Sequence, residues 1–153
     1  MSPILLAADH AGFALKEKLK SYLTQKGLKL KDLGTFSRER CDYPEFAYAL
    51  AKGISSGKYK QGILICKTGI GSAIVANRLP GVRASLCYNA QAARLTREHN
   101  DSNVLVLGSA FVNAAQAKRI VNVWLKTEFA GGRHQRRLNQ IKKIEQEIKG
   151  RQR

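Results

Sequence analysis

Short apolar runs alternate along the chain with longer segments in which apolar residues recur at helical spacing. The apolar runs predict buried strands at residues 4–8, 28–33, 62–66, 82–87 and 104–107. After the first run, Leu15, Leu19 and Leu23 share one helical face and predict a helix that ends at Gly27. Strands that alternate with helices of this length indicate βαβ units. The pattern therefore predicts an α/β fold with a parallel five-stranded sheet and helices on both faces.

Polar and proline residues mark where several of the helices begin. Asp42-Tyr43-Pro44 opens one helix, because the fixed backbone angle of proline suits the first helical turn. Asn89 and Asn113 are placed to cap two further helices, which we expect to end near Glu98 and Trp124. These start signals agree with the periodicity and support the order of elements predicted from it.

The last helical segment breaks the alternation, because no strand follows it. After Gly131-Gly132 the sequence is highly charged, and its apolar positions form one narrow helical stripe: Leu138, Ile141, Ile144 and Ile148. Such a stripe needs a partner surface, and a two-fold dimer is the usual solution. We therefore expect a single domain over residues 1–153, in which residues 134–149 form a helix that contacts a dimer partner and residues 150–153 form a basic tail.

The chain carries a strong positive charge. It has 27 Lys and Arg against 11 Asp and Glu, a formal net charge of +16, which attracts polyanions as well as small phosphates. A basic nucleic-acid-binding module is therefore one alternative. However, the sequence contains no RNP, KH or helix-turn-helix signature, and aromatic residues make up only 7% of it. Basic charge without a stacking surface favours nonspecific attraction, so we expect no specific nucleic-acid partner.

The cysteines and the N-terminus bear on the compartment. Cys41, Cys66 and Cys87 are odd in number and lack C-x-x-C spacing, which predicts neither a disulfide framework nor a zinc site. They are typical of reduced thiols in a cytoplasmic protein. The apolar run near the N-terminus is too short for a signal peptide or a membrane span, so we expect no membrane partner.

The candidate chemistry centres on Cys66, which ends a predicted strand and precedes the loop Lys67-Thr68-Gly69-Ile70-Gly71-Ser72. In an open α/β sheet, ligands bind at the carboxyl ends of the strands, and a glycine-bearing turn into a helix offers N–H groups to a phosphate or an oxyanion. The same N–H groups would stabilise a thiolate. Asp9 and His10 follow the first strand and reach the same edge. A buried structural cysteine is the commoner role of such a residue, so these features alone predict only a phosphate-binding α/β domain with a candidate nucleophile or base.

Five ordered motifs resemble the family of ribose-5-phosphate isomerase type B, which also includes the galactose-6-phosphate isomerase subunits. The motifs lie at residues 9–13, 42–44, 62–71, 97–105 and 131–137. The resemblance extends over about residues 3–148. It implies a Rossmann-like fold, a homodimer or a dimer of dimers, no metal or other cofactor, and interconversion of ribose 5-phosphate and ribulose 5-phosphate. A six-carbon sugar phosphate, allose or galactose 6-phosphate, is the near alternative as substrate.

The resemblance also implies roles for individual residues. Cys66 matches the base that moves a proton α to a carbonyl. Donors that would hold the developing oxyanion are Thr68 and the amides of Gly69, Ile70 and Gly71. His99 matches the residue that opens the furanose ring, and Asp9 would hold substrate hydroxyls nearby.

The remaining matches concern substrate binding. Tyr43 and Asn100 match positions beside the sugar, and His10 matches one at the phosphate. Arg133 and Arg137 also match phosphate ligands, and their guanidinium groups suit a phosphate bidentately. The neighbouring subunit is a candidate source of both arginines. His134 belongs to the same motif, where its role is not separable from positioning.

Two positions depart from the family pattern. Position 67 is usually Gly in the family but is Lys67 here, and its cation either stabilises the neighbouring thiolate, contacts the substrate, or points to solvent. The family often has Arg after the Gly-Ser pair that follows the fifth strand, where this chain has Ala110. One phosphate ligand is therefore expected to be missing at this position.

Overall fold

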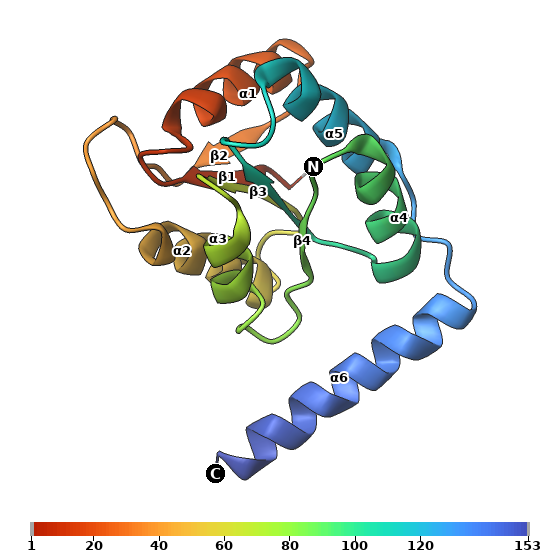
Figure 1. Ribbon diagram of the computed structural model, residues 1–153. Coiled ribbons are helices and arrows are strands. Elements are labelled where there is room, and N and C mark those ends of the chain that lie inside the picture. The colour runs from red at the N-terminus through yellow and green to blue at the C-terminus, as the bar shows by residue number, and fades with distance from the viewer. Residues whose placement is uncertain (1, 153) are drawn as a thin grey trace.

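The computed structural model describes residues 2–152 and contains one parallel five-stranded sheet (Figure 1). Its strands are β1 (Ile4–Ala8), β2 (Leu30–Asp32), β3 (Gly62–Cys66), β4 (Ala84–Leu86) and β5 (Val104–Gly108). They lie in the order β2-β1-β3-β5-β4, and every neighbouring pair is parallel. All five carboxyl ends therefore share one edge of the sheet. The predicted α/β fold is confirmed, although the edge strands β2 and β4 are shorter than the apolar runs suggested. Met1 and Arg153, the ends of the expected domain, lie outside the described residues.

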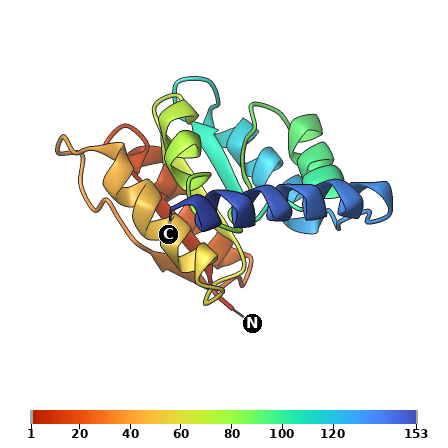
Figure 2. The same cartoon turned by 90° about the horizontal axis from the view of Figure 1, so that it is seen from below.

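Helices cover both faces of the sheet, which gives three layers. They are α1 (Phe13–Gln25), α2 (Tyr43–Ser55), α3 (Ile70–Ala76), α4 (Ala90–Asn100) and α5 (Ala114–Lys126). Helices α1, α4 and α5 pack on one face, and α2 and α3 on the other (Figures 1 and 2). The central strands β1, β3 and β5 are buried at every residue, because side chains of both faces enter one of these two cores. None of the described helices is long and apolar enough to cross a membrane.

Two of the predicted helix starts are confirmed by side-chain caps. The side chain of Asn89 accepts a hydrogen bond from Ala92 N (2.8 Å), and Asn113 and Gln116 form a reciprocal capping box. Helix α4, however, runs to Asn100 rather than ending near Glu98. The chain then turns at Asp101, with a left-handed φ of 44°, and enters β5. The last turn of α4 therefore lies at the amino edge of the sheet.

The C-terminal helix α6 (Arg133–Arg151) projects away from the body and crosses below it (Figures 1 and 2). It begins one residue before the expected boundary and continues through Gly150 and Arg151, which we expected in the tail. A single exposed glycine costs a helix only about 1 kcal/mol, too little to end it here. Glu145 contacts the body by accepting a hydrogen bond from Gly81 N (3.1 Å).

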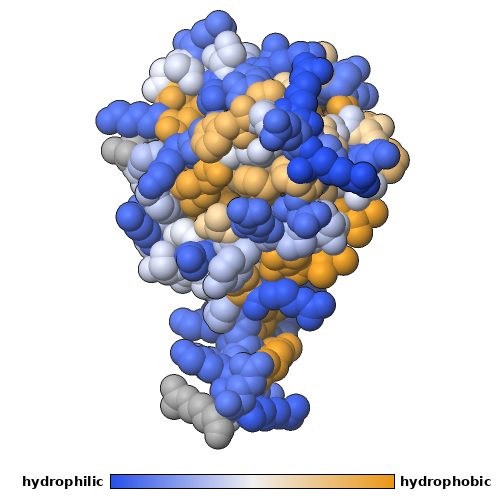
Figure 3. Space-filling view, turned by 90° about the vertical axis from the view of Figure 1, so that its left-hand side faces the viewer, coloured by the Kyte–Doolittle hydropathy of each residue, from blue (hydrophilic) through white to orange (hydrophobic). Residues whose placement is uncertain are grey.

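The predicted apolar stripe of α6 is largely open to solvent. Ile141, Ile144 and Ile148 are 45%, 54% and 52% exposed. Seen from the left-hand side of Figure 1, the helix extends below the body with apolar side chains along one side (Figure 3). Exposed apolar side chains gathered in a row are typical of interaction surfaces.

A buried ion pair fixes α1 to β2 and to the loop that follows it. The Lys16 side chain is fully buried, and its Nζ donates to an Asp32 carboxylate oxygen at 2.6 Å. Lys20 binds the same carboxylate (2.8 Å), which also accepts from Gly34 N (2.9 Å). Burial would raise the pKa of Asp32, but the hydrogen bonds from Lys16, Lys20 and Gly34 outweigh it and lower the pKa.

Replacing Asp32→Asn should destabilise the protein by about 2 kcal/mol near neutral pH, because buried Lys16 loses its main counter-charge. A lowered pKa in the folded state stabilises the fold above the ordinary carboxyl pKa, and this contribution is lost as the pH falls. The difference between wild type and variant should therefore shrink below about pH 4. Urea unfolding near neutral pH and below about pH 4 measures this difference in the free energy of unfolding.

Glu17→Gln provides the matched control, because Glu17 also contacts Lys16 and Lys20 but is 38% exposed. Its removal should cost less than about 1 kcal/mol. If both variants lower the free energy of unfolding equally, the buried Asp32 pair stabilises the fold no more than the exposed Glu17 pair does.

Candidate active site

Cys66 is the last residue of β3, and the following loop folds back over its sulfur. The Sγ atom accepts a hydrogen bond from Gly69 N at 3.2 Å, and the residue is only 4% exposed. Gly69 has a φ of 81°, and a Cβ there would lie 2.4 Å from a methyl carbon of Leu86. Only glycine fits both the backbone angle and the space. The loop therefore aims a backbone donor at the Cys66 sulfur.

Thr68 lies beside the thiol and keeps a free donor. Its Oγ1 accepts a hydrogen bond from Ile70 N (3.2 Å), so the hydroxyl hydrogen remains available to a ligand. Its carbonyl oxygen accepts from the Tyr88 hydroxyl at 3.2 Å. A Cβ on Gly108 would meet this carbonyl at 2.4 Å, so the loops after β3 and β5 touch. These contacts hold Thr68 at the carboxyl edge.

Cys87 differs from Cys66 in its environment. It lies in the core between the sheet and α4, and burial raises the pKa of its thiol to about 11. Cys87 is therefore protonated and inert near neutral pH.

Asp9 and His10 follow β1 and reach the same edge as Cys66. Asp9 is 6% exposed, and its Oδ1 accepts from Gly12 N (3.0 Å) at the turn into α1. The backbone of Cys41 holds the His10 ring through Nδ1, which lies 3.2 Å from Cys41 N and 3.1 Å from its carbonyl oxygen. This leaves His10 Nε2 available to a ligand.

Tyr43, the first residue of α2, packs against the loop that follows β3. A Cβ on Gly71 would lie 2.5 Å from the Tyr43 ring, so glycine allows the ring to rest on the loop backbone. Tyr43 is 40% exposed and therefore borders solvent as well as the loop.

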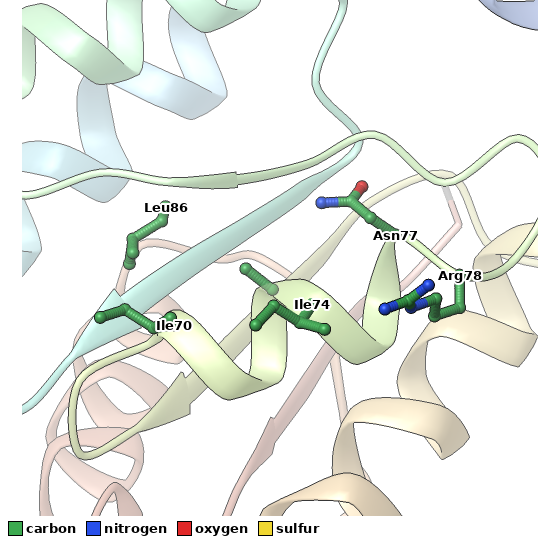
Figure 4. A pocket seen from close by; sticks show the side chains of 6 residues that line it. Ile70, Ile74, Asn77, Arg78 and Leu86 are labelled. Carbon is green, nitrogen blue, oxygen red and sulfur yellow. The ribbon is translucent and has the colours of Figure 1, made fainter.

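These elements enclose a cavity of about 420 Å³, here called the thiol cavity. It is lined by Asp9, Tyr43, Cys66, Lys67, Thr68, Ile70, Gly71 and Ile74. The structure thus brings most of the residues expected at the reacting atoms into one place. A second cavity of about 500 Å³ shares Ile70 and Ile74 with it and is also lined by Leu86 and by Asn77 and Arg78, which follow α3 (Figure 4).

The other predicted site residues form a separate group, here called the histidine–arginine cluster: His99, Asn100, Arg133, His134 and Arg137. The His99 and His134 rings stack with centroids 4.3 Å apart and planes 16° apart. A hydrogen bond from Ala130 N to the Glu98 carbonyl (3.1 Å) holds the start of α6 beside the end of α4. Burial, and then the positive charges of His99, Arg133 and Arg137, lower the pKa of His134 against the opposing pull of Glu98. The pKa of His134 therefore lies below its ordinary value.

The thiol cavity and the histidine–arginine cluster lie at opposite edges of the sheet. Cys66 pairs with Gly108 at the carboxyl end of β5, whereas α4 ends just before Val104 at its amino end. The four-residue offset along β5 alone corresponds to about 13 Å. The expected proximity of His99 to Asp9 is therefore not found within one chain, because a helix that returns to the next parallel strand must end at the amino edge.

A sequence model described as Ribose/Galactose Isomerase matches residues 4–141. The chain belongs to this family. It is 44% identical to ribose-5-phosphate isomerase B of Escherichia coli over 95% of this chain and 98% of that protein. The structure of ribose-5-phosphate isomerase B from Clostridium thermocellum superposes with a TM-score of 0.93, at 43% identity over 95% of this chain and 99% of that one. The structure of the Mycoplasma genitalium enzyme with bound ribulose-5-phosphate gives a TM-score of 0.92, at 39% identity over 95% and 97% of the two chains.

The two departures from the family pattern lie next to each other. Ala110 N donates to the carbonyl oxygen of Lys67 at 2.9 Å, and Ser109 N donates to that of Cys66 at 3.0 Å. Both Lys67 and Ala110 are exposed. The backbones of these two positions are thus in direct contact.

Some contributors to the site had no signal in the sequence. Cys41 supports His10 from 31 residues away, and the Tyr88 hydroxyl supports Thr68 from 20 residues away, both through backbone groups. Ile74 lines the thiol cavity, and nothing in the sequence had singled it out. Within residues 2–152, no three His, Cys, Asp or Glu side chains are grouped so that they could hold a metal ion.

Proposed function

We propose that this chain is an aldose–ketose isomerase that interconverts D-ribose 5-phosphate and D-ribulose 5-phosphate. The observation that carries the proposal is the Cys66 sulfur under the Gly69 amide, at the base of a cavity that also presents Thr68 and Asp9. The ribulose-5-phosphate bound to the Mycoplasma genitalium relative supports the choice of a five-carbon substrate. A six-carbon sugar phosphate remains the alternative to be separated by assay.

Cys66 acts as the base. Its thiolate removes the proton from C2 of the open-chain aldose, and the C1 carbonyl oxygen takes up the negative charge. Return of that proton to C1 and transfer of the O2 proton to O1 then give the ketose. The Thr68 hydroxyl and the amides of Gly71 and Ser72 stabilise the enediolate, since these amides have no partner within α3. The Ile70 amide already donates to Thr68 Oγ1. Asp9 holds the neighbouring hydroxyls.

The histidine–arginine cluster serves the other end of the substrate. His99 opens the furanose ring by proton transfer, because the sugar is mostly closed in solution. Arg133 and Arg137, one helical turn apart on α6, grip the phosphate dianion with their guanidinium groups. His10, which follows β1 at the carboxyl edge of the sheet, contacts the same phosphate. Asn100 and Tyr43 border the sugar between these groups.

One small substrate cannot reach both groups of residues within a single chain, so we propose that the active site forms between two copies. The thiol cavity of one subunit then faces the histidine–arginine cluster of its partner, and a two-fold axis generates two identical sites. The exposed apolar stripe of α6 supports this arrangement, as does the apolar groove along α3. A homodimer is the smallest assembly that completes the site, and two dimers can associate further.

We also propose a cytoplasmic location. Cys41, Cys66 and Cys87 are all free thiols in the structure. A catalytic thiol without a protective disulfide suits a reducing compartment.

The activity is tested by following ribose 5-phosphate conversion to ribulose 5-phosphate, in parallel with allose and galactose 6-phosphates. Wild-type protein should prefer ribose 5-phosphate by kcat/KM, and Cys66→Ala should lower kcat at least about 100-fold, because a general base is lost. Circular dichroism checks that the variant is folded. Near-normal turnover by Cys66→Ala would remove Cys66 from the mechanism, and a preference for a six-carbon substrate would correct the substrate.

The shared site is tested by complementation between two inactive variants. Cys66→Ala damages the thiol cavity, and Arg137→Ala damages the histidine–arginine cluster. When the two proteins are unfolded, mixed and reassembled, each heterodimer should contain one doubly damaged site and one intact site. Random assembly then makes about a quarter of all sites wild type.

Mixing Cys66→Ala with Cys66→Ala,Arg137→Ala is the matched control, because no intact site can form in it. If subunit exchange is demonstrated by mass spectrometry and the first mixture still shows no recovery, both groups of residues act within the same chain.

A further inference from the structure

Lys67 places an ammonium group at the thiol cavity. It lies between Cys66 and Thr68 in sequence, lines the cavity and is exposed. Among the described residues that line this cavity, Lys67 is the only one with a positive charge, and Asp9 is the only carboxylate.

The Lys67 ammonium is not engaged elsewhere. Lys16 and Lys20 pair with carboxylates, and Lys26 and Lys31 donate to tyrosine hydroxyls. Over residues 2–152, by contrast, no salt bridge or side-chain hydrogen bond involves the Lys67 side chain. A four-carbon stem with a free cation at a ligand cavity is able to follow a bound anion.

The charge of the substrate makes this cation relevant. A phosphate monoester carries between one and two negative charges at neutral pH, and its oxygens accept several charge-assisted hydrogen bonds. On the thiol-cavity side, His10 is the only other group proposed to contact it. The guanidinium groups of Arg133 and Arg137 belong to the opposite edge. A cation on the same side as the base would hold the phosphate independently of the partner's arginines.

We propose that Lys67 is a substrate-binding residue whose ammonium contacts the phosphate group of the sugar phosphate. This inference rests on the proposed function, since it concerns the same cavity and the same substrate. It assigns to Lys67 a role in binding the anion and none in moving the proton.

Ala110 provides a site to which the cation can be moved. Its N–H group donates to the Lys67 carbonyl oxygen at 2.9 Å, so the two backbones are in contact, and the small Ala110 side chain is exposed. An arginine at position 110 starts from a backbone position next to Lys67 and has a long side chain with which to reach the same anion. The charge lost in a Lys67 variant can therefore be restored from a neighbouring residue.

The test compares Lys67→Gln, Lys67→Arg and the double variant Lys67→Gln,Ala110→Arg. For each variant, kcat, KM for ribose 5-phosphate and the inhibition constant of inorganic phosphate are measured. Lys60→Gln is the matched control, because this substitution removes the same charge. Lys60 is also exposed, but it lies near the amino end of β3, at the opposite edge of the sheet. It separates a local contact from the general attraction of a basic protein for anions.

We expect Lys67→Gln to raise both KM and the phosphate inhibition constant about tenfold, the size of one lost charge-assisted contact. The kcat value should stay within about threefold, because the contact is equal in ground and transition states. Lys67→Arg and the double variant should recover most of the loss, and Lys60→Gln should change little.

Three results would overturn the assignment. One is an unchanged KM and phosphate inhibition constant in Lys67→Gln, and another is an equal change in Lys60→Gln. A fall in kcat with unchanged phosphate inhibition would place the ammonium at the reacting atoms instead. If wild-type protein does not convert ribose 5-phosphate, the proposed function fails, and calorimetric titration with inorganic phosphate still decides whether Lys67 binds the anion.

Discussion

The direction of the strands governs the placement of every chemical group in this protein. In a parallel sheet each strand ends at one edge, and each connecting helix must bring the chain back to the other edge before the next strand begins. Residues that follow strands, such as Asp9 and Cys66, therefore gather at the carboxyl edge. Residues at the end of a returning helix, such as His99, gather at the amino edge. The thiol cavity and the histidine–arginine cluster are separated by this constraint, and a second copy of the chain is the simplest way to bring them together.

Within the thiol cavity, close backbone packing determines the chemistry. Gly69 adopts a left-handed backbone angle that turns its amide toward the Cys66 sulfur, and Gly71 leaves room for the Tyr43 ring. A larger residue at position 69 would displace the amide that donates to Cys66, and one at position 71 would displace the Tyr43 ring. The same tight packing brings the backbone of Lys67 against that of Ala110, so the loops that follow β3 and β5 are in direct contact.

The sequence predicted the sheet well because its information is local. Buried runs of β-branched and leucine residues, separated by helical patterns, indicate βαβ units without knowledge of long-range contacts. The caps at Asn89 and Asn113 were predictable for the same reason. Boundaries were less predictable, since α4 and α6 both continue past the expected ends, and the low helix propensity of Gly150 is too weak to stop α6.

The candidate site was predictable only in part. The resemblance named candidate residues, but a list of matched residues carries no information about which edge of the sheet each one occupies. The support of His10 by the Cys41 backbone also had no signal, because a main-chain hydrogen bond does not depend on the identity of the side chain. The stacking of His99 on His134 joins two helices and depends on how the chain turns between α5 and α6.

The account depends most on the claim that one active site is built by two subunits. A crystal structure of the protein with ribose 5-phosphate tests it directly. The sugar should lie between Cys66 of one subunit and His99 of the partner subunit, with its phosphate against Arg137 of the partner subunit. A sugar contacted by Cys66 and His99 of the same chain would contradict the account, as would one held in the thiol cavity with no residue of the partner subunit in contact.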